Sequence, residues 1–203
     1  MAATDVSICN SALLKLGANR INTLNDDTKA ARLCQEQYPK LRDAALIAHP
    51  WNFAIKRVFP LSKLVTTPAF GYDNEFQLPV DCLRVLALDT DEFTGGSSQY
   101  HSSVGPHHHG YKIEGRKLLT DLTEVGILYI FQEINTGNYS PSFAEYLAWK
   151  MAEDLSYSLV QSNTTTERMR KSADLILRDV RSFDAQEGTP DEVVANTWIN
   201  SRI

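Results

Sequence analysis

The sequence predicts an α+β fold, in which a helical bundle formed by both chain ends carries an inserted antiparallel β domain. Apolar residues recur at helical spacing within residues 1–50 and again within 137–187. Residues 51–136 instead show alternating and β-branched stretches separated by Gly and Pro. The simplest assembly joins the two helical halves into one domain and leaves 51–136 as a single insert.

The first half of the chain carries two helical patterns. The first covers residues 5–16, with Asp5 placed to cap it and Gly17 to end it. The second covers residues 30–48, where Asp27 or Thr28 would be the cap.

Pro39 lies inside the second helical pattern. Proline removes an amide donor and crowds the carbonyl four residues before it, so we expect a kink or break near residues 35–38. Pro50 should then end the helix, because the residue before a proline is disfavoured in the α conformation.

The stretch HPWNFAIKR follows this helix and is interpreted as the joint between the two domains. Pro50 stops the helix, while Trp51 and Phe53 provide large apolar anchors. Lys56 and Arg57 would then face solvent at the start of a strand. The alternative is a patch that stacks bases and binds phosphates, but such a patch normally has more basic residues nearby.

The inserted residues 51–136 are predicted to form short strands. Alternation predicts strands at 53–59 and 83–88, and a hairpin turning at Glu114-Gly115. The run VGILYIFQEI predicts a central strand that is buried on both faces. Residues 90–110 lack periodicity and predict a long exposed loop.

The second helical half starts at Ser140-Pro141, a serine cap followed by proline at the first helical position. Its broad apolar face predicts the most buried helix. The segment NTTTE at 163–167 predicts a turn, and a last amphipathic helix should end near Gly188. Residues 188–203 form a polar tail with unusually high apolar content.

Charge is unevenly distributed along the chain. The net charge is −5, which argues against a general nucleic-acid binder. Residues 1–63 contain 9 Lys and Arg against 5 Asp and Glu, whereas residues 64–140 contain 4 against 10. Cys9, Cys34 and Cys82 are far apart among apolar residues and are expected to be reduced. We expect neither a secretion signal nor a membrane span.

Residue types that commonly carry chemistry are present, but their patterns are weak. Residues 107–109 are consecutive histidines between Gly and Pro, which favours an exposed loop tip over a metal site. The carboxylate pairs at 26–27, 153–154 and 191–192 are adjacent in sequence, which does not produce the separation that glycosidases need. We therefore expect no catalytic residue, no metal and no cofactor, and no enzyme activity.

Several stretches, in their order and spacing, resemble the tail tubular protein A family of short-tailed bacteriophages, which are head-to-tail adaptors. The stretches are ICNSALLKLGANRINTL, AARLCQEQYPKLRDAALIAHPWNFAIKR, QLPVDCLRVLALD, YKIEGRKLLTD and the aromatic-rich helix after NYSPSF. The resemblance covers most of residues 5–186. It implies a helical bundle with a β domain, in agreement with the periodicity.

The resemblance also implies a role and partners. The protein would be a structural component of the virion, made in the host cytoplasm. It would form a ring of twelve copies between the portal protein and the tail nozzle protein and line the path of the genomic DNA without binding it specifically. The loop at 90–110 matches no stretch of the family and is a candidate contact for nozzle or tail fibre proteins.

Two groups of residues are candidates within this role. The acidic middle of the chain is a candidate lining of the DNA channel, where weak repulsion would let DNA slide; the residues are Asp89, Asp91 and Glu92. The apolar tail is a candidate docking arm onto the portal or a neighbouring copy; its residues are Val193, Val194, Trp198, Ile199 and Ile203. The mildly basic first helices would contact neighbouring subunits.

Two other functions remain open at this point. A virion-associated peptidoglycan hydrolase would need two separated carboxylates in a cleft. A DNA-binding tail or packaging factor would use the segment from Trp51 to Arg57 and would bind in a salt-dependent way.

Overall fold

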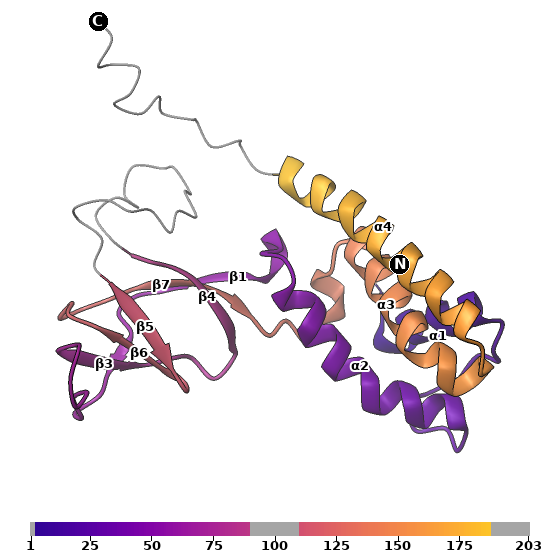
Figure 1. The fold of residues 1–203 in the computed structure, drawn as a ribbon, viewed down its shortest axis with the longest axis horizontal. Helices are drawn as coiled ribbons and strands as arrows, with labels where there is room; N and C mark the ends of the chain where they lie inside the picture. The colour runs from indigo at the N-terminus through magenta and orange to yellow at the C-terminus, as the bar shows by residue number, and fades with distance from the viewer. Residues whose placement is uncertain (1–2, 90–109, 188–203) are drawn as a thin grey trace, which may run out of the picture. The chain divides into compact units, whose positions relative to one another are not determined.

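A computed structural model describes residues 3–89 and 110–187. The fold is α+β, as predicted, with N-terminal and C-terminal helices packed together and antiparallel sheets inserted between them in the chain (Figure 1). The described residues divide into two compact units: a helical unit, up to Ile55 and from Ile130 to Glu187, and a β unit, Lys56–Tyr129. Residues 51–55 and 130–136, placed in the β domain by their sequence, therefore belong to the helical unit.

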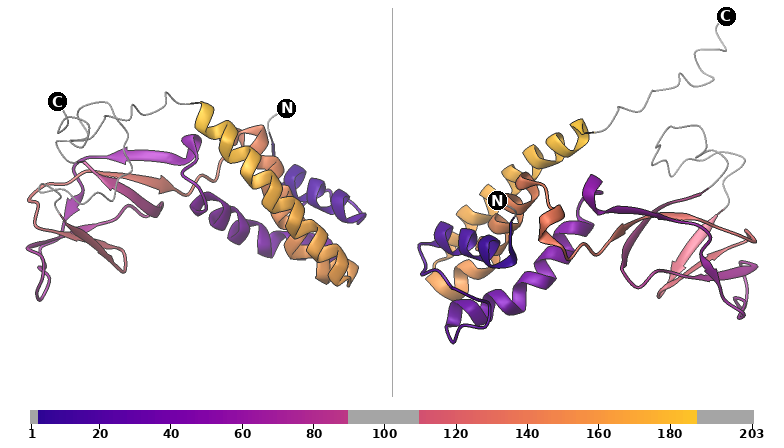
Figure 2. Two further views of the ribbon diagram at one scale, coloured as in Figure 1. Left: turned by 45° about the horizontal axis from the view of Figure 1, so that its top comes forward. Right: turned by 180° about the vertical axis from the view of Figure 1, so that it is seen from behind.

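The helical unit contains four α-helices, which are α1 (Asp5–Leu16), α2 (Lys29–Ile47), α3 (Pro141–Val160) and α4 (Asn163–Gln186). α3 packs against each of the other three (Figure 2). Apolar side chains on several sides of α3 are buried for this reason, among them Phe143, Leu147, Met151 and Leu155. Two short 3₁₀ turns, η1 (Asn52–Ala54) and η3 (Thr136–Asn138), lie beside these helices in the sequence.

Hydroxyl side chains cap the helices. Thr4, rather than Asp5, caps α1: its Oγ1 accepts a 3.1 Å hydrogen bond from the Ser7 amide. Asp5 lies one residue inside and accepts from the Val6 amide. α4 begins at Asn163 with Ser162 as its cap, so the predicted NTTTE turn is in fact the first turn of a helix.

The second helix is not broken at Pro39, so of the predicted kink or break the break is wrong and the kink stays a prediction. α2 runs from Lys29 to Ile47 with Pro39 inside it and Thr28 as its cap. Pro39 is exposed, so the carbonyl that has lost its amide partner can be satisfied by water. Tyr38 and Arg42, next to Pro39 on the helix surface, are buried and hold this part of the helix.

The strands form two sheets. A three-stranded sheet has the order β1 (Ile55–Val58), β7 (Ile127–Phe131) and β4 (Cys82–Leu88). A four-stranded sheet has the order β2 (Ser62–Lys63), β3 (Asn74–Gln77), β6 (Lys117–Thr120) and β5 (Tyr111–Glu114), with antiparallel pairing throughout.

The central strand is as predicted: β7 is flanked on both sides and is buried at 127–130. The hairpin between β5 and β6 turns at Gly115 and Arg116, one residue later than expected. Gly115 has φ 61°, a left-handed conformation that glycine adopts without strain.

Candidate functional site

Two residues of the stretch HPWNFAIKR, Trp51 and Ala54, are buried in the core of the helical unit. Trp51 is 0% exposed, and its indole N–H donates to the Ala45 carbonyl at 2.9 Å. Its ring meets Phe143 edge-on at 5.0 Å and stacks near Phe53 at 6.4 Å. Such a buried ring cannot stack on a nucleic-acid base. The role of Pro50, Trp51 and Phe53 as a joint between domains stays a prediction.

The buried carboxylate of Asp184 links the C-terminal end of α4 to the residues that follow α2. Asp184 Oδ1 accepts from the Asn52 amide at 3.1 Å, and Oδ2 lies 3.2 Å from His49 Nε2. The Asn52 side chain donates in turn to the Asp184 carbonyl at 2.7 Å. These bonds, which we call the Asp184 clasp, give His49 a structural role.

The Asp184 clasp differs from what the helical periodicity predicts. The apolar repeat places Phe183 on the buried stripe, but Phe183 is 59% exposed and Asp184 turns inward beside Val180. The partner of Asp184 is the backbone amide of Asn52 at the start of η1, where a helical turn leaves its first amides unpaired, so no pattern within α4 could have revealed it.

In the β unit, Lys56 and Arg57 are exposed, as predicted, and Lys56 also makes an ion pair. Lys56 donates to Asp81 at 2.9 Å, and the same carboxylate accepts from the Tyr129 hydroxyl at 3.1 Å. Burial tends to raise the pKa of Asp81, but the hydrogen bonds from Lys56 and Tyr129 outweigh it and leave this pKa below its ordinary value. Burial, together with Asp81, raises the pKa of Tyr129 to about 12.

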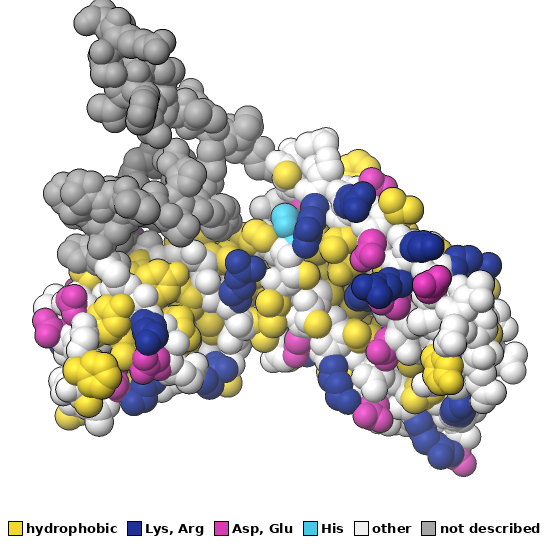
Figure 3. Space-filling model, in the orientation of Figure 1, with side chains coloured by type: hydrophobic (Ala, Val, Ile, Leu, Met, Phe, Trp, Pro, Cys, Tyr) yellow, Lys and Arg dark blue, Asp and Glu magenta, His cyan; other side chains and the backbone are white. Residues whose placement is uncertain are grey.

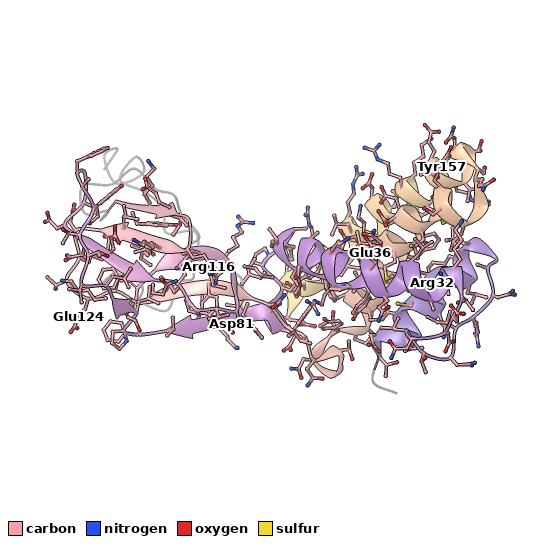
Figure 4. The ribbon with its side chains drawn as sticks, turned by 90° about the horizontal axis from the view of Figure 1, so that it is seen from below. Arg32, Glu36, Asp81, Arg116, Glu124 and Tyr157 are labelled. Carbon is pink, nitrogen blue, oxygen red and sulfur yellow. The ribbon has the colours of Figure 1, made fainter. Side chains whose placement is uncertain are left out.

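The cations of the β5–β6 hairpin also have partners: Arg116 is exposed and Lys117 is partly exposed, yet both make hydrogen bonds. Arg116 donates to the carbonyls of Pro79 and Val80 at 2.5 and 3.0 Å and so holds the turn that enters β4 (Figure 4). Lys117 pairs with Glu75 across the β3–β6 ladder at 2.6 Å. Both cations stabilise the β unit.

A cleft of about 440 Å³ lies in the helical unit. We call it the Tyr38 cleft; it is lined by Thr4, Asp5, Leu24, Gln35, Tyr38, Pro39, Arg42, Ile134, Asn135 and Thr136. Tyr38 is 6% exposed, and its buried hydroxyl lies beside the Tyr139 hydroxyl without a hydrogen bond of good geometry. Burial, with the neighbouring Tyr139 hydroxyl, raises the pKa of Tyr38. Helical spacing marks Tyr38 as a core residue but does not reveal that its oxygen lacks a well-aligned hydrogen bond.

A second cleft, of about 200 Å³, lies in the β unit. Its walls come from β1, β4, β7 and the residues next to them, namely Arg57, Val58, Phe59, Leu88, Asp89, Ile127 and Leu128. Asp89, a candidate channel residue, is exposed, and its amide donates to the Gly126 carbonyl at 2.8 Å. Asp91 and Glu92 lie outside the described residues. So do the docking candidates Val193, Val194, Trp198, Ile199 and Ile203 and most of the loop at 90–110.

The charge asymmetry is weaker in the fold than along the sequence. The described part of the β unit, residues 56–89 and 110–129, contains seven Lys and Arg and seven Asp and Glu. Three of the cations counted above within residues 1–63 lie in this unit, namely Lys56, Arg57 and Lys63. Figure 3 shows both charge signs on the face of each unit turned toward the viewer.

Members of the adjacent carboxylate pairs at 26–27 and 153–154 are used in local contacts, and the pair at 191–192 lies outside the described residues. Asp26 accepts from the Asn22 amide and the Thr23 hydroxyl, and the pKa of Asp26 is lowered by these bonds, from Thr23 first. Glu153 pairs with Lys150 at 2.7 Å. Burial, with the neighbouring Glu153 charge, raises the pKa of Asp154. Each of the two clefts described above has one carboxylate in its wall, rather than the pair a hydrolase needs.

Within residues 3–89 and 110–187, no group of three or more His, Cys, Asp or Glu side chains could hold a metal ion. The three histidines at 107–109 lie outside these ranges. In the same described part of the chain, no helix is long and apolar enough to cross a membrane.

Comparisons with known proteins found no family model that matches this sequence and no match among curated proteins.

Proposed function

We propose that the protein is a structural head-to-tail adaptor of a short-tailed phage virion. It forms a ring between the portal protein and the tail nozzle protein, supports tail assembly and encloses the path of the genome during ejection. The observation that carries the proposal is the architecture: both chain ends build one helical unit, and the β unit is inserted between them. This is the arrangement that the resemblance to the adaptor family implies.

Exposed apolar side chains support the proposal, because partner proteins would bury them in the assembled virion. In the β unit, Phe70 is 89% exposed and Val80 is 95% exposed. In the helical unit, Leu14 and Ile134 are exposed. Apolar side chains gather on the visible face of the β unit (Figure 3). Gathered apolar surface is typical of interaction sites, and a closed ring needs two different complementary faces on each copy.

The engaged charges support a structural role over an enzymatic one. Asp81, Glu75 and Asp184 each accept hydrogen bonds from side chains or amides that hold strands and helices together. A catalytic carboxylate would instead be held ready for a substrate.

The balanced charge of the β unit restricts the proposed channel lining to one segment. Asp89 is the last described residue before the gap at 90–109, and Asp91 and Glu92 follow closely in the sequence. We propose that these three carboxylates face the DNA, where repulsion between like charges prevents tight binding. Charge reversal of all three to Lys should slow ejection; an unchanged ejection rate would remove this assignment.

Native mass spectrometry of the full chain, with and without the portal protein of the same virion, tests the function. The expected result is a defined ring in the presence of the portal. Peptidoglycan degradation by the pure protein would instead support the hydrolase. A salt-dependent shift of DNA in a gel would support the DNA-binding factor. Either result, without a ring, overturns the adaptor.

A further inference from the structure

The loop that joins β2 to β3 carries an exposed phenyl ring. Residues 64–72 contain no charged side chain, and Phe70 is 89% exposed. Val65 and Ala69 of the same loop are exposed as well. The loop extends beyond β3 (Figure 1). Apolar side chains gathered at an exposed site are typical of an interaction surface.

Hydrogen bonds hold both arms of this loop. In the first arm, the Thr66 hydroxyl donates to the Glu75 carboxylate at 3.1 Å. In the second arm, the Asp73 amide donates to the Asp121 carboxylate at 3.1 Å. Phe70 is therefore presented on an anchored loop, which loses less conformational entropy on binding than an unanchored loop would.

The β unit also contains a hollow that fits a phenyl ring. The cleft of about 200 Å³ described above, which we call the Phe59 cleft, is mainly apolar. Its apolar wall residues are Val58, Phe59, Leu88, Ile127 and Leu128. An apolar cavity of about 150 Å³ is large enough to hold a benzene molecule. The volume and the lining of the Phe59 cleft therefore suit the side chain of a phenylalanine.

The charges beside the loop and beside the cleft are complementary. Arg57 lines the cleft, and Asp73 lies at the end of the loop; both are exposed, and neither forms an ion pair within residues 3–89 and 110–187. Asp121 adds a second exposed carboxylate next to Asp73, whereas Lys63 precedes the other arm. Asp89, the second charged residue of the cleft wall, is assigned above to the DNA channel. Arg57 is thus the charge available to an acidic partner.

We propose that Phe70 of one copy inserts into the Phe59 cleft of a neighbouring copy and brings Asp73 next to Arg57. Phe70 of the same chain does not fill the cleft, since it is exposed and is not among the lining residues. The loop and the cleft are two different complementary faces of one chain, as a closed ring requires. This inference rests on the proposed ring, and it specifies one contact between neighbouring copies.

Photo-cross-linking of full-length chains tests the contact. One chain carries Phe70→p-azidophenylalanine, and a second chain, labelled with a heavy nitrogen isotope, keeps the native sequence. The two chains are mixed, alone and with the portal protein, then irradiated and digested. Mass spectrometry should find residue 70 joined to a heavy peptide that contains Phe59, Leu88 or Ile127.

Val80→p-azidophenylalanine is the matched control for position. Val80 is 95% exposed and follows the opposite end of β3, in the turn that Arg116 holds. A photoreactive group at this position should not be joined to the cleft peptides of another copy. Thermal unfolding of both altered chains checks that each keeps the fold.

An exchange of charges tests the chemistry of the contact. Asp73→Arg or Arg57→Asp alone places like charges together and should lower the cross-link yield about two- to tenfold. A chain that carries both substitutions again offers opposite charges to its neighbours and should recover most of the yield. A general loss of folding would not be reversed by the second substitution.

The outcomes separate this inference from the proposed function. A ring with the portal in which residue 70 is joined to no cleft peptide overturns the contact and leaves the adaptor standing. A link confined to single chains, a link from residue 70 to the portal, or a double exchange that restores no yield also overturns it. A link between copies that follows the charge exchange supports the contact even where no ring forms with the portal, and the missing ring would count against the adaptor alone.

Discussion

The helical unit and the β unit of this chain are stabilised by different interactions. The helical unit buries large rings completely, as at Trp51 and Phe143, and extends this core along α3. The β unit has strands of two to seven residues and fastens them with charged pairs such as Glu75–Lys117. Long helices can bury a continuous apolar stripe, whereas short strands cover little surface and depend more on specific bonds. Substitutions should therefore affect the two units in different ways.

The largest effect should come from Trp51→Ala in the helical unit. Truncating a fully buried large aromatic typically lowers the free energy of unfolding by about 3–5 kcal/mol, because it leaves a cavity among the surrounding rings. Denaturant unfolding followed by helical circular dichroism measures this, and ring assembly should weaken too. Trp149→Ala, at a partly exposed site, is the control and should cost less. Equal losses of unfolding free energy in the two variants would show that the packing around Trp51 contributes no more to stability than the packing around Trp149.

A matched test of the β unit is Leu118→Ala in β6. Leu118 is fully buried, and such truncations cost about 2–5 kcal/mol. We expect a value near the low end, because a small sheet can collapse partly around the cavity. Hydrogen exchange of the amides in β3 and β6 measures this loss of stability in the β unit. A cost as large as that of Trp51→Ala would remove the contrast between the two units.

Asp184→Ala should have an intermediate effect. It leaves the Asn52 amide and His49 without their acceptor, at a cost of about 1–3 kcal/mol. The end of α4 should lose protection from hydrogen exchange before the rest of that helix. Asp179→Ala, at an exposed site on the same helix, serves as the control. Unchanged protection near residue 184 would show that packing alone holds the end of α4.

Two tyrosines of the helical unit should respond in opposite directions to loss of their hydroxyls. Tyr139→Phe removes the bond to the Glu133 carbonyl and should cost about 1 kcal/mol. Tyr38→Phe removes a buried oxygen whose contact with the Tyr139 hydroxyl is not a well-aligned hydrogen bond, and it should be neutral or stabilising by up to about 1 kcal/mol. Thermal unfolding of both variants measures the difference. A loss for Tyr38→Phe would mean that this contact acts as a hydrogen bond.

The smallest effect should be a pH dependence in the β unit. A hydrogen bond from Lys117 lowers the pKa of Glu75 below its ordinary value. A lowered folded-state pKa gives stability that is present above the unfolded pKa, near 4.5, and is lost as pH falls through the folded value. Unfolding of the β unit between pH 6 and 3 should show this loss, and Glu75→Gln should flatten the curve. A Glu75→Gln curve as steep as that of the unaltered chain would assign the effect to other carboxylates.

The sequence predicts the long elements of this fold well. The helix at 5–16, the helix from Pro141 and the central strand β7 follow from periodicity, since each element buries its own stripe or faces. Errors arise where a bond comes from a distant part of the chain. Asp184 turns inward because of an amide at Asn52, and Arg116 binds carbonyls at Pro79 and Val80.

The candidate sites were less predictable than the fold. The Tyr38 cleft combines α1, α2 and residues 134–136, and the buried oxygen of Tyr38 lacks a well-aligned hydrogen bond. A one-dimensional pattern records which residues are apolar, but it does not record which hydrogen bonds are missing. The sequence also left open a base-stacking patch at HPWNFAIKR, because the pattern does not record that Trp51 and His49 have their partners within the helical unit.

The Asp184 clasp also has a mechanical consequence. Tension applied to the chain beyond Glu187 reaches the bonds from Asp184 to Asn52 and His49 near the very end of α4. Part of that force therefore passes to the exit of α2, and the remainder passes along the contact between α4 and α3. A force applied beyond Glu187 is thus shared between α4 and the residues that follow α2. This sharing opposes the unfolding of α4 turn by turn from its C-terminal end.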